Sequence, residues 1–217
     1  DSTVRLNFIE PMPKGTPSSL TFAYEGTLAG KEESPIPGIR LAAIHGDHAY
    51  LLYPARWFPL SGYTVDRYTW EAKITVPEGY RVVASGIGNS EPAGPGRVVY
   101  SFSTLRPAFP GSIAVVKGEP LRVPFEGVNT SVYFRGDSAA MSTAYGEETA
   151  RIVTYLSGIY GPAPVSNLTL VETESGAPNG YATDGIVFLS PRSIQQPVNT
   201  RALANQIARQ WWGILVS

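Results

Sequence analysis

Residues 204–213 read Ala-Asn-Gln-Ile-Ala-Arg-Gln-Trp-Trp-Gly and end four residues before the last residue of the chain. Leu203, Ile207 and Trp211 recur at i, i+4 and i+8, the spacing of one face of an α-helix. Gly213 suits the left-handed conformation that ends many helices. The segment is therefore predicted to be a helix with one buried face.

The same helix carries a polar stripe. Arg201, Asn205 and Arg209 share a second face, and Asn199 or Thr200 can cap the helix start. Periodicity alone favours an ordinary amphipathic helix with no site on it. Two adjacent Trp residues directly after an i, i+4 polar pair are uncommon, and they invite comparison with a known motif.

Zinc peptidases carry the helical motif His-Glu-x-x-His, in which both imidazoles bind the metal and the Glu is the general base. The three positions here hold Asn205, Gln206 and Arg209. An amide oxygen is a poor zinc ligand, Gln206 cannot take a proton from water, and a guanidinium repels a divalent cation. We therefore expect no intact metal ligand and no intact catalytic base in this helix.

With its Gln-Trp-Trp-Gly end, the segment resembles the helix His-Glu-x-x-His-x-Trp-(Trp/Phe)-Gly of gluzincin zinc metallopeptidases of the aminopeptidase N (membrane alanyl aminopeptidase) type. Residues 53–59 are similar to the Trp-Phe-Pro segment of that family, residues 68–86 to its next strand pair, and residues 159–161 to its helix-to-strand passage. The resemblance covers roughly residues 1–213. It implies a β domain followed by the start of a thermolysin-like domain, without the third zinc ligand, the catalytic Tyr or the C-terminal domains.

The resemblance also points to a second degenerate motif. Family members carry Gly-x-Met-Glu-Asn before the zinc helix, and its Glu holds the amino group of the substrate. Gly180 and Tyr181 begin the matching stretch, and the Glu position falls on Ala182 or Thr183, neither of which can pair with an ammonium group. Asp184 is the nearest carboxylate, but it is shifted in register. We expect these residues near a lost amine anchor; taken alone, they indicate a Gly-rich loop before a buried strand.

The rest of the chain divides into two parts. Apolar and polar residues alternate at 4–8, 20–24 and 70–76, which predicts an antiparallel β-sandwich or saddle-shaped sheet over residues 1–125. Residues 126–217 follow an α+β pattern: strands at 130–135, 168–173 and 185–189, a helix over 138–156 that Gly158 ends, and the final helix. We therefore expect a mixed fold with a domain boundary near residue 125.

The composition and net charge of the chain limit the classes of partner that we expect. The chain has 217 residues, 43% of them hydrophobic, a net charge of −1 and no cysteine. This balance gives no reason to expect a nucleic acid partner, and no apolar run reaches the roughly 20 residues of a membrane span. We expect a soluble domain, either extracytoplasmic or part of a larger membrane-associated protein. The sequence does not identify its cellular compartment. Its expected partner is an unknown protein or peptide.

The two histidines of the chain, His45 and His48, flank Gly46-Asp47. This spacing predicts a hairpin turn that places the two rings opposite each other. With Asp47 they could hold a metal weakly, but a surface pair is the simpler interpretation, since no third ligand is evident nearby.

Three hypotheses follow for function. The chain is a non-catalytic relative or fragment of a zinc aminopeptidase, without a cofactor and with a scaffold or interaction role. Alternatively, it belongs to a zinc-dependent aminopeptidase or related hydrolase that is active only in a longer parent protein. Finally, it is a β-sandwich binding module whose likeness to the peptidases is accidental.

Overall fold

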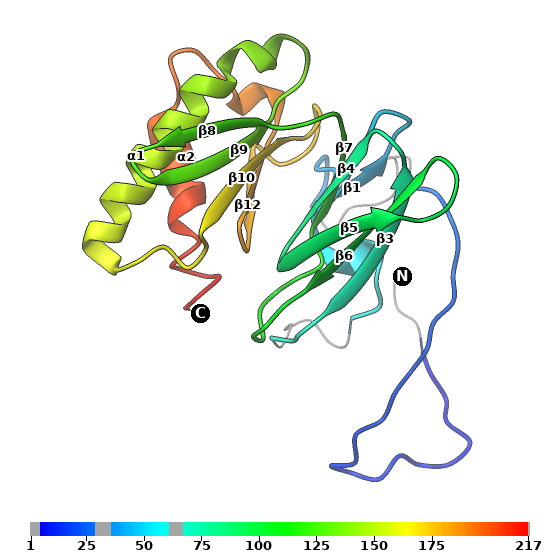
Figure 1. The fold of residues 1–217 in the computed structure, drawn as a ribbon. Coiled ribbons are helices and arrows are strands. Elements are labelled where there is room, and N and C mark those ends of the chain that lie inside the picture. Colours follow the sequence, from blue (N-terminus) through cyan, green and yellow to red (C-terminus); the bar gives the residue numbers. More distant parts are fainter. Residues whose placement is uncertain (1–4, 29–35, 61–66, 217) are drawn as a thin grey trace.

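The structure is a computed structural model that describes residues 5–28, 36–60 and 67–216. Within these residues the strands form three sheets, and two α-helices cover one face of the last sheet (Figure 1). The first two sheets come from the first half of the chain. The third sheet and both α-helices come from the second half.

The first half is a β-sandwich. Its four-stranded sheet has the order β1-β2-β7-β4, and its three-stranded sheet has the order β3-β6-β5; every pair in both is antiparallel. The two sheets share a core of Val76, Val82, Tyr100 and Ile113. The bounds are β1 Ala42–Ile44, β2 His48–Leu51, β3 Glu71–Pro77, β4 Tyr80–Ala84, β5 Ile87–Pro92, β6 Arg97–Ser103 and β7 Ile113–Lys117, with a short helix η1 at Pro54–Arg56.

The second half contains a mixed sheet with the order β11-β12-β10-β9-β8. Its three inner strands are parallel, and the outer strands β8 and β11 are antiparallel to their neighbours. Parallel strands need a long crossover connection, which helix α1 supplies between β9 and β10. The bounds are β8 Leu121–Phe125, β9 Val128–Tyr133, η2 Gly136–Met141, α1 Ser142–Tyr160, β10 Asn167–Glu172, β11 Gly180–Thr183, β12 Ile186–Leu189, η3 Pro191–Ser193 and α2 Thr200–Ala208. The mixed fold predicted from the sequence is confirmed.

Both faces of the mixed sheet are buried. On one face, Leu170 and Val187 pack against α1 and α2. On the other, Val171 and Phe188 pack against Tyr50 and other residues of the four-stranded sheet. Parallel strands covered on both faces are apolar throughout, which explains why β12 consists of four buried residues.

The final helix forms as predicted but is shorter than the motif. The side chain of Asn199 caps its start by accepting a hydrogen bond from the Ala202 amide at 3.1 Å. α2 ends at Ala208, so Arg209 occupies the C-cap position. Gly213 has the expected positive φ of 100°, but it lies in the turns that follow the helix.

Three other sequence predictions need correction or comment. Residues 5–8 and 20–24 are exposed and form no strand, because no sheet edge of the described residues pairs with their backbone; Val4 lies outside the described residues. Helix α1 runs past Gly158 and stops at Gly161, whose φ is 89°. The chain passes from the four-stranded to the mixed sheet between Lys117 and Leu121, and the domain boundary near residue 125 stays a prediction.

Neither α1 nor α2, nor any shorter helix in the described residues, has the length and hydrophobicity that a bilayer crossing requires.

Candidate functional site

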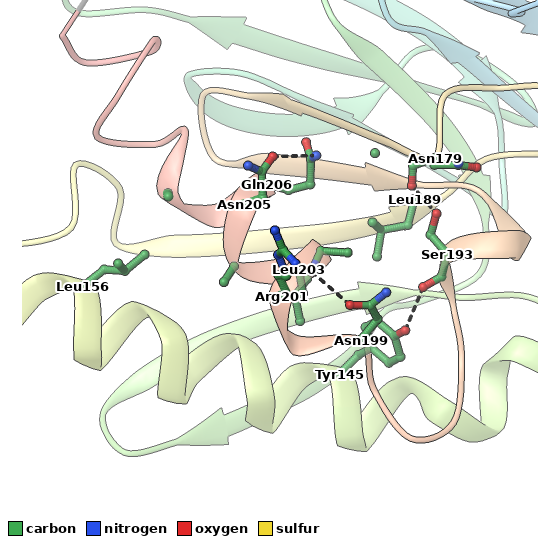
Figure 2. Close-up of a pocket in the computed structure, with 14 residues that line it drawn as sticks. Tyr145, Leu156, Asn179, Leu189, Ser193, Asn199, Arg201, Leu203, Asn205 and Gln206 are labelled. Atoms are coloured by element: carbon green, nitrogen blue, oxygen red, sulfur yellow. Dashed lines mark hydrogen bonds between the residues drawn. The ribbon is translucent and has the colours of Figure 1, made fainter.

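A cavity of about 610 Å³ lies beside α2 (Figure 2). Asn205 and Gln206 of α2 line it together with Gly180 at the start of β11. The structure thus brings together two of the three positions compared with the zinc motif and one residue of the stretch compared with the amine-anchor motif. Leu156, Leu189 and other apolar side chains line the rest with several polar groups.

Gln206, at the general-base position, lies directly over β11. A Cβ atom built on Gly180 would be 2.7 Å from Gln206 Cδ, so a larger residue at this position would require the Gln206 side chain to shift. Gln206 Nε2 donates a hydrogen bond to Asn205 Oδ1 at 3.4 Å, whereas Gln206 Oε1 is buried without a partner in the described residues. Asn205 therefore pairs with its neighbour rather than with Arg209 one turn further on.

The opposite wall is held by hydrogen bonds to the loop around η3. Tyr145 Oη donates to the Ser193 carbonyl at 2.9 Å and accepts from the Gln195 amide at 2.8 Å. Ser190 Oγ donates to Asn179 Oδ1 at 3.1 Å, and Ser193 Oγ donates to the Asn179 carbonyl. Figure 2 shows two of these contacts, Tyr145 with Ser193 and Ser193 with Asn179, which link α1 to the loop before β11. This wall of the cavity is therefore polar and hydrogen-bonded.

The other predicted site residues lie outside the cavity. Tyr181 lies on the face of the mixed sheet that packs against the β-sandwich. Its ring centroid is 6.3 Å from that of Phe188 on β12. Ala182 packs against the helix-side core, and Thr183 is buried. Arg209 is exposed and does not line the cavity. Of the residues that the sequence analysis compared with the two family motifs, only Gly180, Asn205 and Gln206 line this cavity.

The zinc that the family resemblance implies does not fit these residues. No histidine or carboxylate side chain lines the cavity within the part of the chain that the structure describes. Its donors are amides, hydroxyl groups and the guanidinium of Arg201. Zinc sites in proteins use imidazole, thiolate and carboxylate ligands, so this donor set does not suit a zinc ion.

Sequence reasoning missed Tyr145, Ser193 and Arg201 as cavity residues. They come from α1, from η3 and from the first turn of α2, and no motif links these three positions. It also missed the role of Gln210, whose side chain joins the end of α2 to the β11–β12 turn. A buried Gln beside two Trp residues gives no local signal of which backbone groups it meets.

Comparison with solved structures identifies the architecture. A zinc metallopeptidase of the M1 family from Deinococcus radiodurans superimposes with a TM-score of 0.63 at 23% identity over 82% of this chain. The fold is that of part of an M1 zinc metallopeptidase. A variant of the enzyme from Deinococcus radiodurans gives a TM-score of 0.65 at 24% identity, and a two-domain M1 variant bound to L-arginine gives 0.61 at 23%, each over 84% of this chain.

The match is partial in both sequence and length. The chain spans 44% of the length of two of these structures and 43% of the third. No protein-family model matches the sequence, and no curated protein matches it. At this identity the likeness establishes the fold, and it confirms the fold that the Trp-Trp-Gly resemblance implied.

Proposed function

We propose that this chain is a non-catalytic relative or part of a zinc aminopeptidase that keeps the fold and serves as a scaffold or interaction module. The observation that carries the proposal is the position of Gln206. Gln206 lines the cavity at the sequence position where the resemblance expects the general base, and its uncharged amide cannot accept a proton from water.

The lost amine anchor supports the same conclusion. Ala182 and Thr183 lie at the family's Glu position, and neither lines the cavity. Asp184, the nearest carboxylate in sequence, sits in the β11–β12 turn and is also absent from the lining. An α-ammonium group placed in this cavity would meet amides and an Arg instead of a carboxylate, which weakens binding of a free peptide N-terminus.

An interaction role is supported by apolar surface at the end of α1. Tyr160 and Trp212 are both exposed and pack edge to face with ring centroids 5.5 Å apart. Ile159 and Val216 are also exposed. Aromatic residues are enriched in protein interfaces, and we propose a protein or peptide as the partner.

The proposal is tested by assaying the purified chain, and any longer protein that contains it, on a panel of aminoacyl-anilides with added zinc. We expect no hydrolysis above the rate of a heat-unfolded sample. Hydrolysis by either protein that a chelator abolishes, and that Gln206→Ala reduces, would overturn the proposal.

A zinc-dependent aminopeptidase that is active only in a longer parent protein is the second candidate. This chain spans less than half of the matched structures, and a longer protein that contains it would offer further residues as ligands. Chelator-sensitive hydrolysis in the parent but not in this chain would support this second candidate, and a flat result in both would dismiss it.

A further inference from the structure

The hairpin that carries both histidines forms as predicted. His45 and His48 flank the turn between β1 and β2, and the His45 amide donates to the His48 carbonyl at 2.8 Å. The two ring centroids are 4.8 Å apart. Both imidazoles therefore project to the same side of the turn.

The carboxylate of Glu174, which is distant in sequence, lies beside the two histidines. Glu174 follows β10, 129 residues after His45, and its Oε2 lies 2.8 Å from His45 Nε2. The ligand atoms of His45, His48 and Glu174 all lie within 4.8 Å of one another. The expectation that the hairpin has no third ligand nearby was wrong, because the loop after β10 lies against the hairpin in three dimensions.

The tautomer of His48 leaves one nitrogen free to bind a ligand. His48 Nδ1 lies 2.9 Å from Asp47 Oδ1, and since a carboxylate only accepts, the proton is on Nδ1. The lone pair is then on Nε2, which is buried and has no hydrogen-bond partner in the described residues. A carboxylate that holds the distal nitrogen of a ligating histidine is the usual second shell of a protein zinc site.

The carboxylate of Glu174 is oriented as well. Tyr50 Oη donates to its Oε1 at 2.8 Å, and Arg40 Nη1 lies 3.2 Å from the same oxygen, so Oε2 remains directed at the histidines. Two cations oppose a metal here: Arg40, and Arg135, whose Nη1 lies 3.9 Å from Asp47 Oδ2. The Arg40 side chain is 45% exposed, so solvent screens much of its repulsion.

We propose that His45, His48 and Glu174 bind one divalent transition-metal ion of the zinc type. Two imidazoles and one carboxylate suit Zn²⁺ and its first-row neighbours better than Mg²⁺ or Ca²⁺, which prefer oxygen ligands alone. Tetrahedral coordination with bonds of about 2.0–2.1 Å separates ligand atoms by roughly 3.3 Å, so the three ligand atoms, which lie within 4.8 Å of one another, move closer together when they bind the ion. Water takes the fourth position, and the ion joins the four-stranded sheet to the loop after β10.

The test is calorimetric titration of Zn²⁺ into the chain, stripped with a chelator and free of any affinity tag. We expect one-to-one binding that both His48→Ala and Glu174→Gln abolish. Asp47→Asn keeps all three ligands and should weaken binding by about 10–100-fold, the usual effect of losing a second-shell carboxylate. Zinc should also raise the unfolding temperature of the wild-type chain and leave that of Glu174→Gln unchanged.

Two controls make the result decisive. Glu71→Gln removes an exposed carboxylate on β3 and should bind zinc as the wild type does. Asn205→Ala alters the degenerate zinc motif and should also leave binding unchanged. The proposal is wrong if the wild-type chain does not bind zinc, if the folded His48→Ala or Glu174→Gln variant binds it equally well, or if Asn205→Ala abolishes binding. The last result would place the metal at α2 and would contradict the proposed function as well.

Discussion

Gln210, the first residue of the Gln-Trp-Trp-Gly segment, stabilises the fold by hydrogen bonding to backbone groups of another segment. Its side chain is 2% exposed; Oε1 accepts from the Gly185 amide at 3.0 Å, and Nε2 donates to the Thr183 carbonyl at 2.9 Å. Gln210→Leu leaves the buried Thr183 carbonyl and the partly buried Gly185 amide unpaired, so we expect a loss of about 2–4 kcal/mol in the free energy of unfolding, measured by urea denaturation. Gln195→Leu, at an exposed position, should change it by less than about 0.5 kcal/mol. Equal effects of the two substitutions would contradict this role of Gln210.

Asp184 occupies the same turn and is destabilising when charged. Burial raises its pKa, an effect that the charge of Arg106 partly opposes, and Asp184 Oδ1 is buried without a partner in the described residues. Because the folded-state pKa exceeds the unfolded one, stability falls as pH rises from the ordinary Asp value through the folded pKa. Asp184→Asn keeps a favourable Asn-Gly turn and should be more stable than the wild type at pH 7, with the difference shrinking toward pH 4. Urea midpoints at both pH values provide the measurement, and a wild type that is the more stable protein at pH 7 would refute the prediction.

Helix α1 depends on a glycine for its contact with β8. A Cβ on Gly146 would lie 2.6 Å from Val123 Cβ and from Val123 Cγ2, whereas a Cβ on Gly158 meets no atom within 4 Å. Gly146→Ala should therefore lower stability by about 1–3 kcal/mol through overpacking, despite the better helix propensity of alanine. Gly158→Ala in the same helix should raise stability by up to about 1 kcal/mol. Thermal unfolding of both variants tests the pair, and the same sign of change in both would show that the close approach is unimportant.

Local sequence patterns predicted those helices and strands whose spacing and capping residues are present in the segment itself. The helical spacing and the Asn199 cap located α2, and alternation located β3. Alternation at 20–24 was an equally clear strand pattern, but a strand also needs a partner backbone, which no local pattern encodes. Glycine ends many helices but also occurs inside them, so Gly158 is a poor predictor of the helix end; the actual stop, Gly161, is distinguished by its backbone conformation.

At the scale of the whole molecule, sequence reasoning predicted one wall of the cavity and two of the three residues, His45 and His48, of the proposed metal-binding group. Gly180 and Gln206 belong to stretches that could be compared with a known pattern. Tyr145 and Glu174 enter their sites only because the crossover helix and the loop after β10 fold back on distant segments. Such contacts depend on sheet order, which sequence periodicity does not specify.

The sheet order also predicts how the molecule unfolds. Tyr50 of the four-stranded sheet and Phe188 of the mixed sheet, each 1% exposed, belong to one core. Unfolding either half would expose the apolar face of the other, so we expect a single transition rather than two. Phe188→Ala should lower the free energy of unfolding by about 3–5 kcal/mol.

Tryptophan fluorescence can separate the two halves. Trp70 reports on the β-sandwich and Trp211 on the helix-side core. We expect variants that keep only one of these two tryptophans, with Phe at the other three positions, to unfold at coincident urea midpoints, and Phe188→Ala to lower both midpoints equally. If Phe188→Ala shifts the Trp211 transition and leaves the Trp70 transition in place, the two halves fold independently and the shared core does not couple them.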